Sequence, residues 1–259
     1  MHQHGHEGQS QPSHAARLLT VASDQTIGAV VPNPDGSEVA YSAQPCVGTR
    51  PLPGLYLRNL KTGATREIAT TTYCSSIGQP VWNAAGTEVA YRFRPSSSRP
   101  EPSPIGSSGP GCPDAANPSW HLVITKTAPR SRQVLLASSH HGCSIDAAAF
   151  DSRGILVAEG CSAKHHSLSF DGAGRGPGYL LQYTKRGNLT ARIPLPYRGL
   201  DPEQTLIANE PHSDKILITQ DQPNGLVTRN DDHVYELIGT RLRQAVEHSW
   251  GSAFIAVPW

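Results

Sequence analysis

The fold is decided by the stretch PNPDGSEVAY at residues 32–41, because residues 80–91 repeat its pattern as PVWNAAGTEVAY. In the first copy, Pro34 presets φ for a tight turn, Asp35 bonds to its own turn and Gly36 supplies a positive φ. The residues after each turn include β-branched and aromatic types that suit a pleated sheet. Residues 55–68, LYLRNLKTGATREI, add a second turn between two further strands. One unit therefore predicts four short antiparallel strands, named a, b, c and d in chain order.

Four-stranded antiparallel units that recur along one chain are typical of β-propeller blades. The unit PDG-x-x-x-AY, LYL and TG-x-x-x-x-I resembles the WD-like repeat of TolB-type β-propellers. The resemblance covers most of the chain and is strongest in the first two units. It implies an all-β propeller, in which we expect Gly36, Gly86 and Gly154 at equivalent tight turns between strands a and b. Three aromatic residues are expected in the core between blades: Tyr41, Trp82 and Phe150.

The repeat divides the chain into a polar tail, residues 1–14, and a propeller domain, residues 15–259. We predict about four full blades and a partial fifth, built from an outer strand in residues 15–22 and an inner strand in residues 253–259. Joining strands from both termini in one blade removes exposed edges. Strands b and c of this fifth blade are missing, so the propeller is expected to be truncated or to close unusually.

The composition excludes some classes of partner. The chain has 259 residues and a formal net charge of +1, which gives no reason to expect binding to nucleic acid or to an anionic membrane. It has no apolar run of about 18 residues, so we expect no transmembrane helix. The first residues, MHQHGHEG, lack the apolar region of a signal peptide. Either the protein is cytoplasmic, or the chain is a fragment or a misassigned start of an exported protein.

Several residues that often bind metals or phosphates fall in predicted connections, where we favour a solvated loop or tail over a site. The glycine-rich residues 172–178 lack the Lys of a phosphate-binding loop and do not open a helix. The acidic stretch 230–232, placed in the fourth b–c loop, lacks the spacing of a calcium loop. Adjacent histidines rarely converge on a metal without acidic partners. The histidines concerned are His2, His4, His6 and His14 in the tail, and the pairs His140–His141 and His165–His166.

No catalytic constellation is found. The G-x-S-x-G elbow of serine hydrolases is absent, and we assign no catalytic, cofactor-binding or metal-binding residue. The b–c and d–a connections of a propeller leave one face, here called the loop face, and its long connections are the expected binding surface. We therefore expect a non-catalytic module without cofactor that binds a protein or a small ligand, not nucleic acid, and self-associates through open blade edges. The alternatives are a propeller enzyme with a metal or acid–base site in its channel, and a degenerate fragment without independent function.

Five cysteines are the most informative feature outside the repeat, and all are expected on the loop face. They are Cys46, Cys74, Cys112, Cys143 and Cys161. Their spacing lacks the C-x-x-C of a zinc site, so we favour disulfides, which indicate an oxidising compartment. We give the cysteines more weight than the missing signal peptide and expect an extracytoplasmic protein. Because the number is odd, one thiol is left without an intramolecular partner.

A disulfide between Cys143 and Cys161 is expected from the register of blade three. Its a–b turn is centred between Ser152 and Arg153, which places Cys161 opposite Ser144, one position from Cys143. A β-bulge or a small shift of the turn centre accommodates this offset, and cross-strand cysteines then lie within bridging distance.

The other cysteines are harder to pair. A turn in blade one centred on residues 34–35 places Cys46 opposite Ser23, so Cys46 must find its partner elsewhere. Cys74 is its nearest candidate on the loop face. Cys112 competes for Cys74 and is otherwise the odd thiol.

Overall fold

The computed structural model describes most of the expected blades and not the two ends of the chain. The described residues are 25–45, 54–71, 75–95, 120–128, 131, 133–139, 143–162, 175–196, 205–209, 215–223 and 230–250. Within these residues the chain forms sixteen β-strands and no helix. The polar tail and both strands of the expected fifth blade lie outside the described residues.

The sixteen strands form four sheets of four, in chain order. Blades one and two are β1 (Gln25–Pro32), β2 (Glu38–Pro45), β3 (Gly54–Asn59), β4 (Thr65–Thr70), β5 (Ser76–Trp82), β6 (Glu88–Arg94), β7 (His121–Lys126) and β8 (Gln133–Ser138). Blades three and four are β9 (Cys143–Asp151), β10 (Gly154–Ser162), β11 (Arg175–Tyr183), β12 (Leu189–Pro194), β13 (Thr205–Asn209), β14 (Ile216–Pro223), β15 (Asn230–Ile238) and β16 (Arg241–Trp250).

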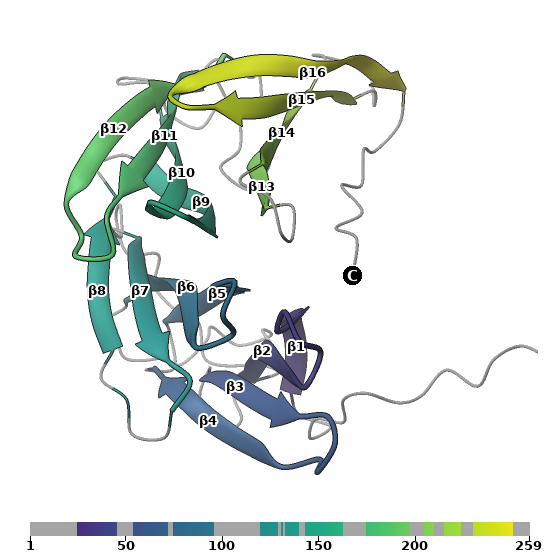
Figure 1. The fold of residues 1–259 in the computed structure, drawn as a ribbon, viewed down its shortest axis with the longest axis vertical. Helices are drawn as coiled ribbons and strands as arrows, with labels where there is room; N and C mark the ends of the chain where they lie inside the picture. The colour runs from purple at the N-terminus through teal and green to yellow at the C-terminus, as the bar shows by residue number, and fades with distance from the viewer. Residues whose placement is uncertain are drawn as a thin grey trace, which may run out of the picture.

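Each sheet is antiparallel throughout and places its strands in the order a, b, c, d. Figure 1 shows the four blades arranged along an arc, with β1, β5, β9 and β13 toward the inside and β4, β8, β12 and β16 along the outside. The expected all-β architecture of four-stranded blades is therefore confirmed.

Three apolar cores lie between successive blades, where the facing sheets pack apolar side chains against each other. The core between blades one and two contains Leu55, Leu57, Val89 and Tyr91. The core between blades two and three contains Leu122, Ile145, Phe150, Ile155 and Val157. The core between blades three and four contains Leu156, Leu180, Ile216 and Ile218. Fully burying one such leucine or isoleucine stabilises the fold by roughly 1.5–3 kcal/mol.

The repeated turn between strands a and b is closed by an asparagine. In blade one the Asn33 side-chain oxygen accepts a hydrogen bond from the backbone N–H of Glu38, and the backbone N–H of Asn33 donates to the Glu38 carbonyl. Asn83 makes the same pair of bonds with Glu88 in blade two. Both asparagines are buried, so each polar side chain is satisfied inside the turn.

The turn glycines adopt the expected backbone. Gly36 and Gly86 have φ of 71° and 66°, and Gly154 has φ of 153°. The turn of blade three is shorter than the other two, because Asp151 pairs directly with Gly154. In blade one, Pro32 pairs with Val39, so the turn centre lies one residue later than expected.

A one-residue bulge recurs in strand a. The register shifts between Ile27 and Val30 in β1, and between Ile77 and Pro80 in β5. In β9, Ala147 pairs with Ala158 but Ile145 pairs with the next residue, Glu159. Asp146 is therefore the extra residue of the bulge. The bulge therefore belongs to the repeat, although the repeat pattern did not reveal it.

Side chains of one blade donate hydrogen bonds to backbone carbonyls of the next. From blade two to blade one, Trp82 donates to Val31 at 3.0 Å and Gln133 donates to Ile68 at 3.1 Å. From blade two to blade three, Arg92 donates to Ile145 at 3.0 Å. From blade three to blade four, Arg153 donates to Gly239 at 3.2 Å. In all four bonds the donor is a side chain and the acceptor is main chain.

Three sequence predictions are corrected by the strand register. β11 begins at Arg175, so the end of the glycine-rich stretch 172–178, which was expected in a loop, is a strand, in which Gly178 pairs with Gly160. β15 begins at Asn230, so residues 230–232 pair with β14 instead of forming a loop. Tyr41 lies on the sheet face away from blade two, where it stacks on Tyr56 with ring centroids 5.4 Å apart. Trp82 and Phe150 do pack at blade–blade cores, as predicted.

Candidate binding site at the loop face

The ends of blades two and three at the loop face carry the best-defined group of polar and aromatic side chains among the described residues. Strands β6 and β7 are joined by residues 95–120, and β10 and β11 by residues 163–174. The site is built from the strand ends that flank these two connections. We call it the loop-face cluster and define it as Arg92, Arg94, Trp120, the Cys143–Cys161 disulfide and Glu159.

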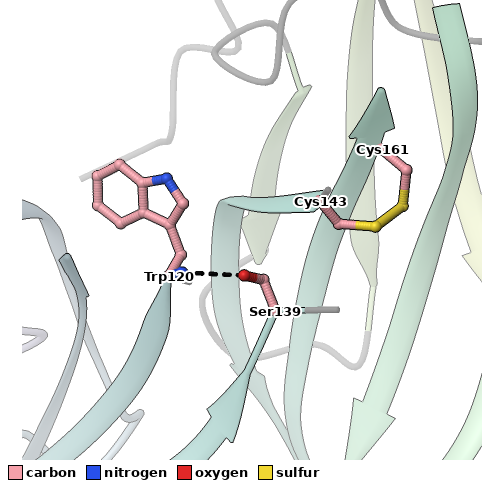
Figure 2. The surroundings of a disulfide bond; sticks show 4 residues. All are labelled: Trp120, Ser139, Cys143 and Cys161. Atoms are coloured by element: carbon pink, nitrogen blue, oxygen red, sulfur yellow. Dashed lines mark hydrogen bonds between the residues drawn. A yellow bond between two sulfur atoms is a disulfide. The ribbon is translucent and has the colours of Figure 1, made fainter. Parts of the chain in front are cut away.

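Trp120 is held just before β7 by two hydrogen bonds with Ser139, the residue after β8. Its N–H donates to the Ser139 Oγ at 2.9 Å, and its carbonyl accepts from the Ser139 N–H at 2.7 Å. Figure 2 shows the indole beside this hydrogen bond, near the disulfide of the next blade. The side chain is half-buried, so one part of the ring packs on the core and another part is open to solvent.

Two guanidinium groups approach the Trp120 ring. The central carbon of Arg92 is 5.0 Å from the ring centroid and that of Arg94 is 5.8 Å away, both within the range of a cation–π interaction. Gly78 makes room for Arg92, because a Cβ at that position would sit 2.4 Å from the Arg92 Nε. Arg92 also donates from Nη1 to the Ile145 carbonyl at 3.0 Å. The tryptophan and the arginines therefore form one positioned group across the interface between blades two and three.

Cys143 and Cys161 are joined by a disulfide across β9 and β10 (Figure 2). Their Cα atoms are 3.9 Å apart, and the two residues are direct cross-strand partners. The sequence placed Cys161 opposite Ser144. The bulge at Asp146 shifts the register by one residue, so that Cys161 pairs with Cys143 instead. Cys46, Cys74 and Cys112 lie outside the described residues, so their proposed pairings stay predictions.

Glu159 is a fully buried acid beside the disulfide. It lies two residues before Cys161 on β10, on the same face of the strand, and has no exposed surface. Its carboxylate and the two cysteine sulfurs lie within 4.8 Å of one another. Burial raises the pKa of Tyr183, the charge of Glu159 raises it further, and Arg192 opposes the rise. Glu159 therefore influences other side chains inside blade three.

The position of Glu159 is apolar in blades one and two. In each of blades one to three, one residue of strand b pairs with the strand-a residue just before the bulge. That residue is Ala43 in blade one, Phe93 in blade two and, because the turn is shorter, Glu159 in blade three. Neither equivalent carries a charge. The propeller repeat therefore does not require an acid at this position.

His121 lies at the same end of blade two, on the side that faces blade one. Its Nδ1 is 2.7 Å from the Ser138 Oγ, and its ring is 6.4 Å from that of Phe93. Burial lowers the pKa of His121, which favours the neutral imidazole at neutral pH.

The sequence missed most of the loop-face cluster. Only the two cysteines were predicted, from the hairpin register. The tail histidines and the pairs His140–His141 and His165–His166 lie outside the described residues. A signal for the rest was present in the second repeat, where Arg92 and Arg94 occupy the strand end that carries Ser42 and Gln44 in the first repeat.

The comparisons with known proteins agree with the architecture. No family model and no curated protein matches the chain. The structure is similar to the β-propeller domain of the trilobed protease from Pyrococcus furiosus, with a TM-score of 0.51 and 11% identity, over 89% of this chain and 59% of that chain. The fold is a β-propeller.

Two further solved structures have lower scores. TolB from Acinetobacter baumannii has a TM-score of 0.47 and 13% identity, over 86% of this chain and 44% of that chain. An oligogalacturonate lyase in complex with manganese has a TM-score of 0.45 and 11% identity, over 83% of this chain and 51% of that chain. The chain thus spans less than two thirds of each of these proteins. The resemblance to TolB-like propellers holds at the level of the fold.

No helix among the described residues has the length and hydropathy that crossing a bilayer requires.

Proposed function

We propose that this propeller is a non-catalytic binding module that engages a protein partner through its loop face. The observation that carries the proposal is the Trp120 ring, which is half-buried and lies against Arg92 and Arg94. Tryptophan and arginine are the residue types that most often dominate binding energy at protein interfaces.

The geometry supports this role in a second way. Binding loops work best on rigid supports, and both long connections beside the cluster start from fixed strand ends. The Cys143–Cys161 disulfide lies at the start of the connection 163–174. The paired hydrogen bonds between Trp120 and Ser139 fix the end of the connection 95–120. A preorganised support lowers the entropic cost of binding a partner.

Replacing Trp120 with alanine should remove partner binding while the fold is retained. We expect the affinity for a partner captured from the source organism to fall about 30-fold, which corresponds to a loss of about 2 kcal/mol at one interface hot spot. Arg94→Ala should weaken binding less, because Trp120 remains. Surface plasmon resonance with the captured partner measures both variants.

The matched control is Lys61→Ala, an exposed residue in the c–d turn of blade one on the opposite face. It should bind as the wild type does. Equal losses for Trp120→Ala and Lys61→Ala would contradict binding through the loop face, provided that circular dichroism shows all three proteins folded.

The competing proposal is an enzyme with a metal or acid–base site in the propeller channel. Metal analysis of the purified protein separates the two functions when it is done on a variant without Cys143 and Cys161. A stoichiometric metal retained by that variant would support a channel site. Its absence would leave the binding module as the simpler function.

We also propose that the protein acts outside the cytoplasm. The support is the Cys143–Cys161 disulfide, since stable disulfides are rare in reducing compartments.

Self-association is proposed through the outer strand of blade two. Val134 and Leu135 of β8 are 50% and 58% exposed, and exposed apolar edge strands favour pairing between chains. A hollow of about 280 Å³ lined in part by Val134 and Leu136 lies beside this edge.

Leu135→Lys should shift the protein toward monomer in sedimentation experiments, because a charge on an edge strand opposes pairing. The matched control is Leu189→Lys, since Leu189 of β12 is 49% exposed on the equivalent strand of blade three. A wild-type protein that is monomeric at all concentrations would contradict the proposal, as would equal effects of the two variants.

A further inference from the structure

Glu159 is the buried polar group that the propeller fold explains least. The equivalent residues of blades one and two are Ala43 and Phe93, and Glu159 itself has no exposed surface. Glu159 has interaction partners there, and the repeat does not require an acid at its position. What sets it apart is the pair of cysteines beside it.

Its neighbours are two sulfur atoms. The Sγ atoms of Cys143 and Cys161 and a carboxylate oxygen of Glu159 all lie within 4.8 Å of one another. In a tetrahedral zinc site the metal is about 2.3 Å from sulfur and about 2.0–2.2 Å from a carboxylate oxygen, so its ligands lie roughly 3.5–4 Å apart. Rotations of the three side chains cover the difference once the sulfurs are no longer bonded.

We propose that Cys143, Cys161 and Glu159 bind one zinc-class divalent ion when the disulfide is reduced, and release it when the disulfide forms. Two thiolates and a carboxylate suit a borderline-soft ion such as Zn²⁺. Three protein ligands leave the fourth position to water. The cysteines are half-buried, whereas Glu159 is fully buried, so the ion enters from the cysteine side.

The charges around the site are consistent with a bound dication. Two thiolates and one carboxylate carry three negative charges, and a divalent ion leaves one uncompensated. Arg92 reaches the same place from blade two, because its Nη1 donates to the carbonyl of Ile145, the cross-strand partner of Glu159. The guanidinium therefore offsets the remaining charge of the occupied site.

The redox step is balanced by a small thiol or disulfide. Two molecules of a thiol reductant give two electrons and two protons to the Cys143–Cys161 bond and become a disulfide. Binding of Zn²⁺ then displaces the two thiol protons. In the reverse direction, a small disulfide accepts two electrons from the thiolates and is split into two thiolates, the protein disulfide forms again, and the ion leaves. The site shares the disulfide with the loop-face cluster, but metal binding is measured without a partner, so the two proposals can fail separately.

Cobalt(II) is the probe for the site, because thiolate coordination gives an intense near-ultraviolet absorption that histidine or carboxylate sites lack. The experiment uses the full chain with Cys46, Cys74 and Cys112 replaced by serine, so that only the pair Cys143 and Cys161 remains. The reduced, anaerobic protein should bind one equivalent of cobalt with a thiolate band, and zinc should displace it. The same protein oxidised with a small disulfide should show no band.

Two variants in the same background decide the ligands. Cys143→Ser with Cys161→Ser should lose the band, and Glu159→Gln should lower the cobalt affinity at least about 10-fold. The proposal is overturned if the reduced protein shows no band above the double serine variant, or if Glu159→Gln binds cobalt as tightly as its parent. If the triple-serine background does not fold, native mass spectrometry compares the reduced wild type with Cys143→Ser/Cys161→Ser. The wild type should carry one zinc ion more than the variant. Equal zinc content in the two proteins would overturn the proposal.

Discussion

Replacing Gly154 with alanine should destabilise the protein by about 3 kcal/mol or more, the largest effect expected of a single methyl group in this chain. Gly154 has φ of +153°, which L-residues rarely adopt, and a Cβ there would lie 2.1 Å from the carbonyl oxygen of Tyr183 and 3.0 Å from the Thr184 Cα. These are backbone atoms of the neighbouring strand and cannot rotate away. The clash is relieved only if β10 and β11, the two central strands of blade three, move apart.

Gly36→Ala is the matched control. Gly36 closes the equivalent turn of blade one with φ of +71°, and a Cβ there would meet nothing within 4 Å. Only the left-handed backbone then opposes alanine, at a cost of about 1 kcal/mol. Urea unfolding followed by circular dichroism measures both free energies. Equal losses for the two variants would show that the contact with Tyr183 relaxes without cost.

Removing the Cys143–Cys161 disulfide should lower the free energy of unfolding by about 3 kcal/mol at most, because the bond constrains an unfolded chain across a sequence separation of 18 residues. The double variant Cys143→Ser/Cys161→Ser should melt at a lower temperature than the oxidised wild type. A reductant should destabilise the wild type much more than the variant. Chelator is included throughout, so that no metal compensates the loss.

Peptide mapping under non-reducing conditions tests the same bond directly. Digestion of the oxidised, folded protein should release a peptide pair linked through Cys143 and Cys161. Alkylation of both cysteines in that protein would show that the register of β9 against β10 is wrong. The mapping also gives the partners of Cys46, Cys74 and Cys112.

The local chemistry of the turns made most of the fold predictable. Pro34, Asp35 and Gly36 specify a turn by their own conformational preferences, and the side chain of Asp35 accepts from the Ser37 N–H at 2.8 Å, as expected of such a turn. The second repeat then extends the argument to blade two. Strand positions followed to within a few residues, because apolar runs between such turns have few other arrangements.

The register was less predictable, because pairing between strands depends on contacts that one strand does not encode. Nothing in Ile145-Asp146-Ala147 alone indicates a bulge, and its presence emerges only when β9 is set beside β10. In the same way, β15 extends to Asn230 because β14 offers pairing partners as far as Pro223. Tyr41 was expected in a core between blades from its strand position in the repeat, yet the described residues place no blade against that face of blade one.

The candidate site was the least predictable part. Arg92 of β6 and Trp120, just before β7, belong to blade two, whereas Glu159 of β10 belongs to blade three. They meet only because those blades pack side by side. Glu159 becomes notable only after the short turn of blade three is known, since the repeat pattern alone aligns it with Tyr41 and Tyr91. A buried acid in an apolar position is a signal that needs the register before it can be recognised.

The hydrogen bonds between blades have a consequence for how such a chain changes over evolutionary time. Trp82, Gln133, Arg92 and Arg153 each donate to a main-chain carbonyl of the adjacent blade. A carbonyl is present whatever residue occupies the accepting position, so these bonds constrain the donor and leave the acceptor's identity open. Neighbouring blades can therefore diverge, or be duplicated and exchanged, without the paired substitutions that contacts between two side chains would demand. A saturation mutagenesis scan would show this as an asymmetry, with a narrow range of residues accepted at Gln133 and a wide range at Ile68.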